Sequence, residues 1–357
     1  MRNISQPPEP SPEAPLPGSA PAVPRGGLLS LPGQVLAFFF NLFEPLFALG
    51  QKWLGSSRIG WLFVGPNLLL IAVFTFAPIA INLVYAFTGG MNLLPSQRPF
   101  TGLENFHILL ECRDYADLQT CRTDVFWRAV VNTAQFSVLQ VVLMLFFSLV
   151  TALVLNRRII GRGFWRGVFF YPVLLSPVVV ALIWKWLLQS QGVFNAGLVA
   201  VGAQPMDWLL DGHWAFFWVL VVSIWAHMGF YTLILLAGLQ AIPKDVYEAA
   251  EMDAASPLRV LTRITLPLLM PNLVVVLVLV MIRAVQIFDE VFVLTGGGPG
   301  SATTFIVQYI YQTGFAEQIH LYGLAAAASL LLAAGLMALT LLQLRLSRAK
   351  EAGAPRK

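Results

Sequence analysis

Residues 247–271 read YEAAEMDAASPLRVLTRITLPLLMP, a polar and charged stretch that lies between two long apolar runs. The two runs, residues 216–239 and 272–294, are each long enough to cross a bilayer, which takes about 20 residues of helix. Charged groups such as Glu248 and Arg259 are costly inside hydrocarbon. The stretch therefore predicts a short, water-exposed hairpin at a membrane surface, and contact with another protein is its expected role.

The composition indicates a membrane protein with several spans. Hydrophobic residues make up 57% of the 357-residue chain and charged residues only 11%, whereas soluble domains carry about 25% charged residues. The net charge of +4 is modest, and the basic residues are scattered among the loops. Nucleic-acid binding needs a concentrated basic face, which this pattern does not offer.

Hydropathy predicts an all-α polytopic fold with about six transmembrane helices. The spans are placed at residues 61–87, 130–155, 168–188, 216–239, 272–294 and 323–344. They belong to a transmembrane domain assigned to residues 59–346, whose loop at residues 241–271 contains the polar hairpin.

The two ends of the chain are expected to lie outside this domain. Residues 1–58 read as a proline-rich, disordered tail followed by an interfacial helix near residues 28–54. A seventh span over residues 28–54 is the alternative, which Pro32, Glu44 and Pro45 disfavour. Residues 347–357 form a basic tail.

The distribution of basic residues predicts the orientation. With both termini in the cytoplasm, most of the 22 Lys and Arg residues fall in cytoplasmic segments, as the positive-inside rule requires. The same orientation places the Glu248 hairpin in the cytoplasm. Lys185 and Arg283 fall within predicted spans.

Two cysteines, Cys112 and Cys121, fall in the first outer loop. In an oxidising compartment they could close a small disulfide loop. Two free thiols are the alternative, since sequence does not show proximity. A zinc site is disfavoured, because only His107 lies nearby to assist the thiols.

The hairpin resembles the EAA loop of the permease subunits of binding-protein-dependent ABC importers. The matching residues are Glu248, Ala249, Ala250, Asp253, Ile264, Leu266 and Pro267. The resemblance implies a coupling helix that docks on a cytoplasmic ATPase, with Pro267 at the entry to the fifth span. The chain departs from the family at Ala254, where glycine is usual. Glycine takes left-handed backbone angles freely, so alanine there predicts a variant turn.

Further segments, between about residues 61 and 344, resemble the carbohydrate-type importer permeases of the maltose and glycerol-phosphate transporter group. They are TGLENF at 101–106, FWR and NT at 126–133, NRR and GRG at 156–163, Pro172 with Ser176-Pro177 and WKW at 184–186, and LTGGGPG at 294–300. The resemblance implies a type I importer permease for a sugar or a related polyol or glycerol-derived solute.

The resemblance also implies the partners and the location. They are a second homologous permease, two copies of a cytoplasmic ATPase that uses ATP and Mg, a periplasmic solute-binding protein and the lipid of a bacterial inner membrane. This chain itself is expected to bind no cofactor or metal and to carry no catalytic residue. Its coupling residues are expected to be Glu248, Ala249, Ala250, Asp253, Ala254 and Pro267.

Polar residues within the spans are candidates for the solute path, because they are costly in lipid. On the fifth span Arg283, Gln286 and Glu290 follow a helical face, with Asp289 beside them. Either Arg283 and one of the two acids form a structural ion pair, or this face lines the path. On the fourth span Trp225, His227 and Tyr231 offer donors and a stacking surface that suit a sugar.

Two other classes of function compete with an importer permease. An ion-coupled secondary transporter predicts internal repeats, and none is evident here. An intramembrane enzyme would use Asp289, Glu290 and His227. The chain lacks the G-x-x-x-x-G-K-[ST] phosphate-binding motif and the H-E-x-x-H motif, so ATP hydrolysis by the first route is excluded.

Overall fold

The computed structural model describes residues 59–157 and 159–352, and these are helical apart from loops and two isolated bridges. Backbone contacts divide the chain into two units, residues 1–76 and 77–357. The described part of the first unit is α2 (Ile59–Ile71) and the π-turn Ala72–Phe76. The predicted tail and interfacial helix at residues 1–58 lie outside the described residues, as do Arg158 and residues 353–357.

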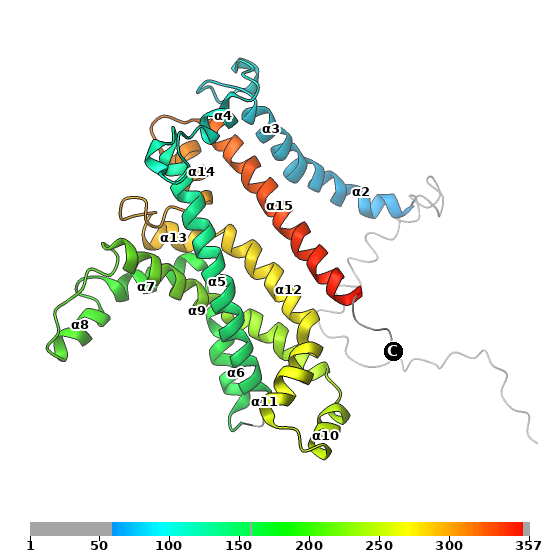
Figure 1. Ribbon diagram of the computed structural model, residues 1–357. Helices are drawn as coiled ribbons and strands as arrows, with labels where there is room; N and C mark the ends of the chain where they lie inside the picture. The colour runs from blue at the N-terminus through cyan, green and yellow to red at the C-terminus, as the bar shows by residue number, and fades with distance from the viewer. Residues whose placement is uncertain (1–58, 158, 353–357) are drawn as a thin grey trace, which may run out of the picture. The chain divides into compact units, whose positions relative to one another are not determined.

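The second unit begins with α3 (Ala77–Ala86) and a loop that contains α4 (Glu104–Leu110), and it ends with α15 (Tyr322–Ala352). Between them it contains α5 (Asp124–Asn156), α6 (Arg162–Phe170), α7 (Pro177–Leu188), α8 (Val193–Ala200), α9 (Gly212–Ala241), α10 (Lys244–Met252), α11 (Pro257–Val260), α12 (Leu266–Val285), α13 (Asp289–Leu294) and α14 (Ile306–Tyr311). Figure 1 labels these helices.

Within residues 59–157 and 159–352, six helical stretches are long and apolar enough to cross a membrane, which confirms the predicted all-α class with about six spans. They are Val64–Ala86, Asp124–Asn156, Pro177–Ala200, Gly212–Ala241, Pro257–Val285 and Tyr322–Arg345. Two of the predicted spans nevertheless have the wrong limits.

The predicted third span, residues 168–188, is not one helix. α6 ends at Phe170, a 3₁₀ turn covers Tyr171–Leu174, and α7 begins at Pro177 after an extended Ser176. Pro172 and Pro177 lack the N–H that an uninterrupted helix would need at these positions. The stretch that is long and apolar enough to span starts instead at Pro177 and reaches Ala200, with a second break at residues 189–192, between α7 and α8.

The predicted fifth span, residues 272–294, is displaced toward the N-terminus. Its helical stretch starts at Pro257, inside the polar hairpin, passes through the π-turn Leu261–Thr265, and ends at Val285. Phe288 has φ −148° and ψ −60°, which is not helical, and the short α13 follows. Pro267 is the second residue of α12 and follows the π-turn directly, and prolines and π-turns are both sites where a long helix bends.

α5, α9 and α12 pack side by side as the centre of the second unit (Figure 1). Gln140 on α5 donates a hydrogen bond of 3.0 Å to Ser223 on α9. Gly229 allows α9 to approach the backbone where α6 ends, because a Cβ atom there would overlap the Phe169 carbonyl. Small residues at helix interfaces allow this close packing in membranes.

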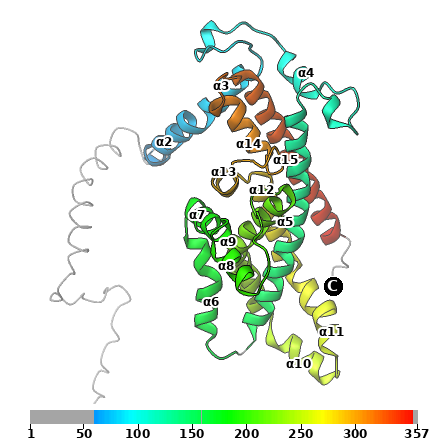
Figure 2. The ribbon, with the colours of Figure 1, turned by 90° about the vertical axis from the view of Figure 1, so that its left-hand side faces the viewer.

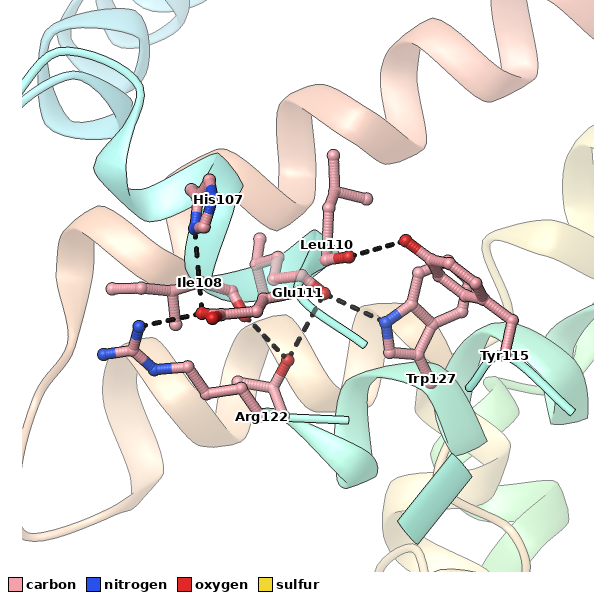
Figure 3. A network of polar contacts seen from close by, with 9 residues as sticks. His107, Ile108, Leu110, Glu111, Tyr115, Arg122 and Trp127 are labelled. Atoms are coloured by element: carbon pink, nitrogen blue, oxygen red, sulfur yellow. Dashed lines mark hydrogen bonds and ion pairs between the residues drawn. The ribbon is translucent and has the colours of Figure 1, made fainter. Parts of the chain in front are cut away.

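The loop before α5, predicted to lie on the outer side, is fixed by covalent and polar contacts. Cys112 and Cys121 are joined by a disulfide. A dashed line in Figure 3 joins Arg122 to Glu111, and Arg122 donates this hydrogen bond at 3.0 Å. The Trp127 indole donates to the Leu109 carbonyl at 3.0 Å. These contacts attach the loop to the start of α5.

Candidate functional site

The polar hairpin consists of α10, a turn and α11, at one end of α9 and α12 (Figures 1 and 2). Glu248 and Ala249 are exposed, whereas Ala250 is buried. Behind them the Tyr247 hydroxyl lies 3.3 Å from the Thr265 hydroxyl, which joins α10 to the π-turn. Glu248 forms no ion pair with any described residue. The exposed Glu248 carboxylate and the small Ala249 side chain are therefore free to contact the surface of another protein.

The turn after α10 keeps the shape that glycine would give it. Ala254 has φ +50°, in the left-handed region, so the expected variant turn is wrong. Ala254 N–H bonds to the Glu251 carbonyl and Ala255 N–H to the Ala250 carbonyl, each at 3.0 Å. This pair of bonds is the Schellman ending of a helix. Alanine in the left-handed region costs about 1 kcal/mol, which the bonds around it offset.

A second set of predicted residues forms an ion cluster between α9, α12 and α13. Arg283, near the end of α12, donates to the Glu290 carboxylate at 3.0 Å. His227 on α9 lies 3.5 Å from the same carboxylate oxygen and also contacts Arg283. The other His227 ring nitrogen lies 2.9 Å from the Ser223 carbonyl.

The cluster exists despite the wrong helix limits. Because α12 ends at Val285, Arg283, Gln286 and Glu290 do not share one helical face as predicted. The non-helical residues after Val285 instead turn the chain so that Glu290, in the first turn of α13, returns to Arg283. Of the two candidate acids, Glu290 is the partner, and its side chain is only 4% exposed. Asp289 is exposed and has no ion pair among the described residues.

A polar cavity of about 280 Å³ lies beside this cluster. Five of the predicted solute-path residues line it, namely Tyr231, Arg283, Gln286, Asp289 and Glu290. Its wall therefore combines a hydroxyl, an amide and charged groups with apolar surface, and this combination suits a ligand rich in hydroxyl groups.

Two predicted residues lie outside the lining. Trp225 packs its ring edge against Trp184, with ring centroids 5.7 Å apart. His227 belongs to the ion cluster but does not line the cavity. The structure adds six residues to the lining, the polar Ser223 and five apolar ones that include Phe288. Ser223 lies four residues before His227, on the same helical face, so the sequence could have identified it. Phe288 depends on the break after α12, which hydropathy does not reveal.

Residues 123–351 match the family model of the binding-protein-dependent transport system inner membrane component. The chain is 35% identical to the trehalose/maltose transport system permease protein of Thermococcus litoralis, over 82% of this chain and 95% of that protein. It is 32% identical to the sulfoquinovosyl glycerol transport system permease protein of Agrobacterium fabrum, over 84% of this chain and 94% of that protein.

A solved structure has the same fold. It is the crystal structure of a bacterial ABC transporter involved in the import of the acidic polysaccharide alginate. The TM-score is 0.69 at 25% sequence identity, and the match covers 88% of this chain and 99% of that chain.

Glu290→Gln tests the ion cluster. The substitution removes the charged acceptor of Arg283, whose side chain is 41% exposed, and we expect the free energy of unfolding to fall by about 2 kcal/mol, as for a hydrogen bond to a charged group. Thermal unfolding of the purified protein in detergent measures the change. Asp289→Asn, the matched removal of an exposed charge on the next residue, should leave the unfolding temperature nearly unchanged. Equal effects of the two substitutions would contradict the cluster.

Ala254→Gly tests the turn of the hairpin. Glycine removes the left-handed strain of alanine, and we expect the substitution to stabilise the folded hairpin by about 1 kcal/mol. Hydrogen exchange of the amides in α10 should become slower. Ala255→Gly places glycine beside the left-handed position and should not slow this exchange. Slower exchange in the Ala255 variant alone would contradict the assignment.

Proposed function

The chain belongs to the binding-protein-dependent transport system inner membrane component family, and from this premise we propose how it takes part in import. It is a multi-pass permease subunit of a carbohydrate-type ABC importer, a transport component and not an enzyme. We propose that it forms half of the path for a sugar or a related polyol or glycerol-derived solute. A second, homologous permease supplies the other half.

The proposed role of the hairpin is to couple this path to ATP hydrolysis. Two copies of a cytoplasmic ATPase, which use ATP and Mg, dock beneath the two permeases. One copy receives α10, where Glu248 meets basic or amide groups of the ATPase and Ala249 permits close approach. Asp253, Ala254 and Pro267 set the turn and the helix entry that hold α10 in place. This role requires the hairpin and both termini to lie in the cytoplasm, which agrees with the charge distribution.

The proposed solute path passes the polar cavity beside the ion cluster. Tyr231, Gln286 and Asp289 line it, and their hydroxyl, amide and carboxylate groups suit the hydroxyls of a sugar. The Arg283–Glu290 pair connects the end of α12 to α13, so movement of α12 changes the cavity wall. Because α11, the π-turn and α12 form one helical stretch, a displacement of the hairpin reaches Arg283 along a single element.

Import then follows from a shift between two states. A periplasmic binding protein delivers solute when the path is open outward, and ATP binding to the ATPase pair favours that state. Each ligand shifts the balance only through its different affinity for the two states. The helical connection from the hairpin to the cavity is the observation that carries the proposal.

The two competing functions are not favoured. Neither an ion-coupled secondary transporter nor an intramembrane enzyme gives a role to an exposed acidic hairpin between two spans. The relatives at 35% and 32% identity are both transport system permease proteins.

Glu248→Lys tests the coupling role. Reversal of this charge should place a lysine against the basic or amide groups of the ATPase, and we expect at least a tenfold loss of ATPase co-purification, a change of about 1.4 kcal/mol. Uptake that depends on the binding protein should fall with it, while the permease remains in the membrane. The matched control is Glu317→Lys, which reverses an exposed charge far from the hairpin in sequence. Unchanged ATPase binding and uptake in the Glu248 variant would refute the role.

A further inference from the structure

α6 contains two arginines that the proposed transport function does not use. Arg162 and Arg166 lie four residues apart, so their side chains share one face of the helix. Both guanidinium groups meet α9 at Gln240. With its amide oxygen turned toward them, Gln240 accepts hydrogen bonds from Arg162 at 3.0 Å and from Arg166 at 2.7 Å. We call Arg162, Arg166 and Gln240 the arginine site.

The charge of the arginine site has no counter-ion in the described part of the chain. Neither guanidinium forms an ion pair with a described carboxylate. The Nε atoms of Arg162 and Arg166 are buried and have no hydrogen-bond partner. Both side chains are only partly exposed. Two like charges at this spacing repel each other, so the site is incomplete without an anion.

The helix end adds to the positive potential. Arg162 is the first residue of α6, the N-cap residue Gly161 provides no side-chain cap, and the first turn contains no acidic residue. A helix N-terminus carries a partial positive charge and free N–H groups. Arginines normally avoid this position, whereas phosphate groups bind there. The positive potential of the helix start and of the two arginines therefore favours a bound anion.

The surroundings of the site are apolar and open. Ile160 is 99% exposed, Phe164 69% and Trp165 45%. Aromatic residues beside basic residues are typical of the membrane interface. Gly163 and Gly167 lie on the same helix, and a Cβ atom at either one would have no neighbour within 4 Å. Each glycine follows one of the arginines and lies about 100° around the helix from it, so a head group has room beside the guanidinium groups while acyl chains contact the exposed apolar side chains.

We propose that the arginine site binds the phosphate of an acidic phospholipid, such as phosphatidylglycerol. Gln240 accepts the hydrogen bonds of both guanidinium groups, and α10 begins four residues after Gln240. α6 lies beside α9, toward the end where α10 and α11 are found (Figures 1 and 2). The bound lipid thus fixes the α6–α9 contact at the base of the hairpin.

The test is native mass spectrometry of the full-length permease, purified with its co-expressed partner subunits and titrated with phosphatidylglycerol or phosphatidylcholine. The unaltered protein should retain phosphatidylglycerol selectively. The double variant Arg162→Gln/Arg166→Gln should bind it about 30-fold more weakly, since each basic residue near a membrane surface contributes a similar share of the attraction. The matched control is Arg113→Gln/Arg345→Gln, two exposed arginines far in sequence from α6 and from the hairpin, which should keep the affinity.

Four results would overturn the proposal. The first two are that the arginine-site double variant keeps its affinity for phosphatidylglycerol, or that the control variant loses as much. The third is that inorganic phosphate at equal concentration displaces the lipid. The fourth is that the arginine-site double variant loses the ATPase but still binds the lipid. Displacement by phosphate would identify a soluble anion as the ligand, and loss of the ATPase would assign the arginines to that partner. If the double variant does not fold, Arg162→Gln and Arg166→Gln are measured singly. Each should weaken binding about fivefold, and no change in either would also overturn the proposal.

Discussion

A hydrocarbon layer accepts a polypeptide only where the backbone N–H and C=O groups are bonded within the protein. This constraint explains why the spans are helices and where the chain can leave the helical form. The break after Val285 is tolerated because nearby groups bond inside the protein, as Gln286 N–H does with the Ile282 carbonyl at 3.2 Å. At the other end of α13, Lys185 on α7 donates to the Val293 carbonyl at 3.0 Å. The interrupted segment is thus held by its neighbours.

The same break produces the chemistry of the cavity. A continuous helix would carry Glu290 away from Arg283 by about two turns, or roughly 10 Å along the axis. The interruption instead brings the carboxylate to 3.0 Å from the guanidinium, with His227 of α9 beside them. The Glu290 carboxylate is only 4% exposed, whereas Arg283 is 41% exposed, and a buried carboxylate is costly unless a partner such as Arg283 is present. The pair therefore fixes one arrangement of α9, α12 and α13, and the proposed path depends on that arrangement.

Hydropathy predicted the number of spans because about 20 apolar residues have few alternatives to crossing a bilayer. It misplaced the third and fifth spans because proline breaks and a polar helix end change average hydropathy little. Pro172 and Pro177 were visible in the sequence, and their effect on a single long helix could have been foreseen. The left-handed Ala254 could not, since local propensity disfavours it and the Schellman bonds around it decide the shape.

Candidate residues on one span were easier to predict than contacts between spans. The sequence left open whether Arg283 pairs with one of the two acids or lines the path, and the pairing with Glu290 depends on the break after α12. The place of His227 required the packing of α9 against α13, which one sequence does not give. For Trp225 the sequence showed a suitable ring, but packing turned it toward Trp184. The sequence thus identified Trp225 by its residue type, whereas the orientation of its side chain depended on packing.

The side of the membrane on which α10 lies tests the account most directly. The sequence contains two cysteines, and both are in the disulfide, so Glu248→Cys introduces a single free thiol. A membrane-impermeant maleimide should label it in inverted membrane vesicles and not in right-side-out vesicles, and added ATPase subunits should protect it. Labelling in right-side-out vesicles alone would contradict the account, because the hairpin would then lie on the side from which the solute enters.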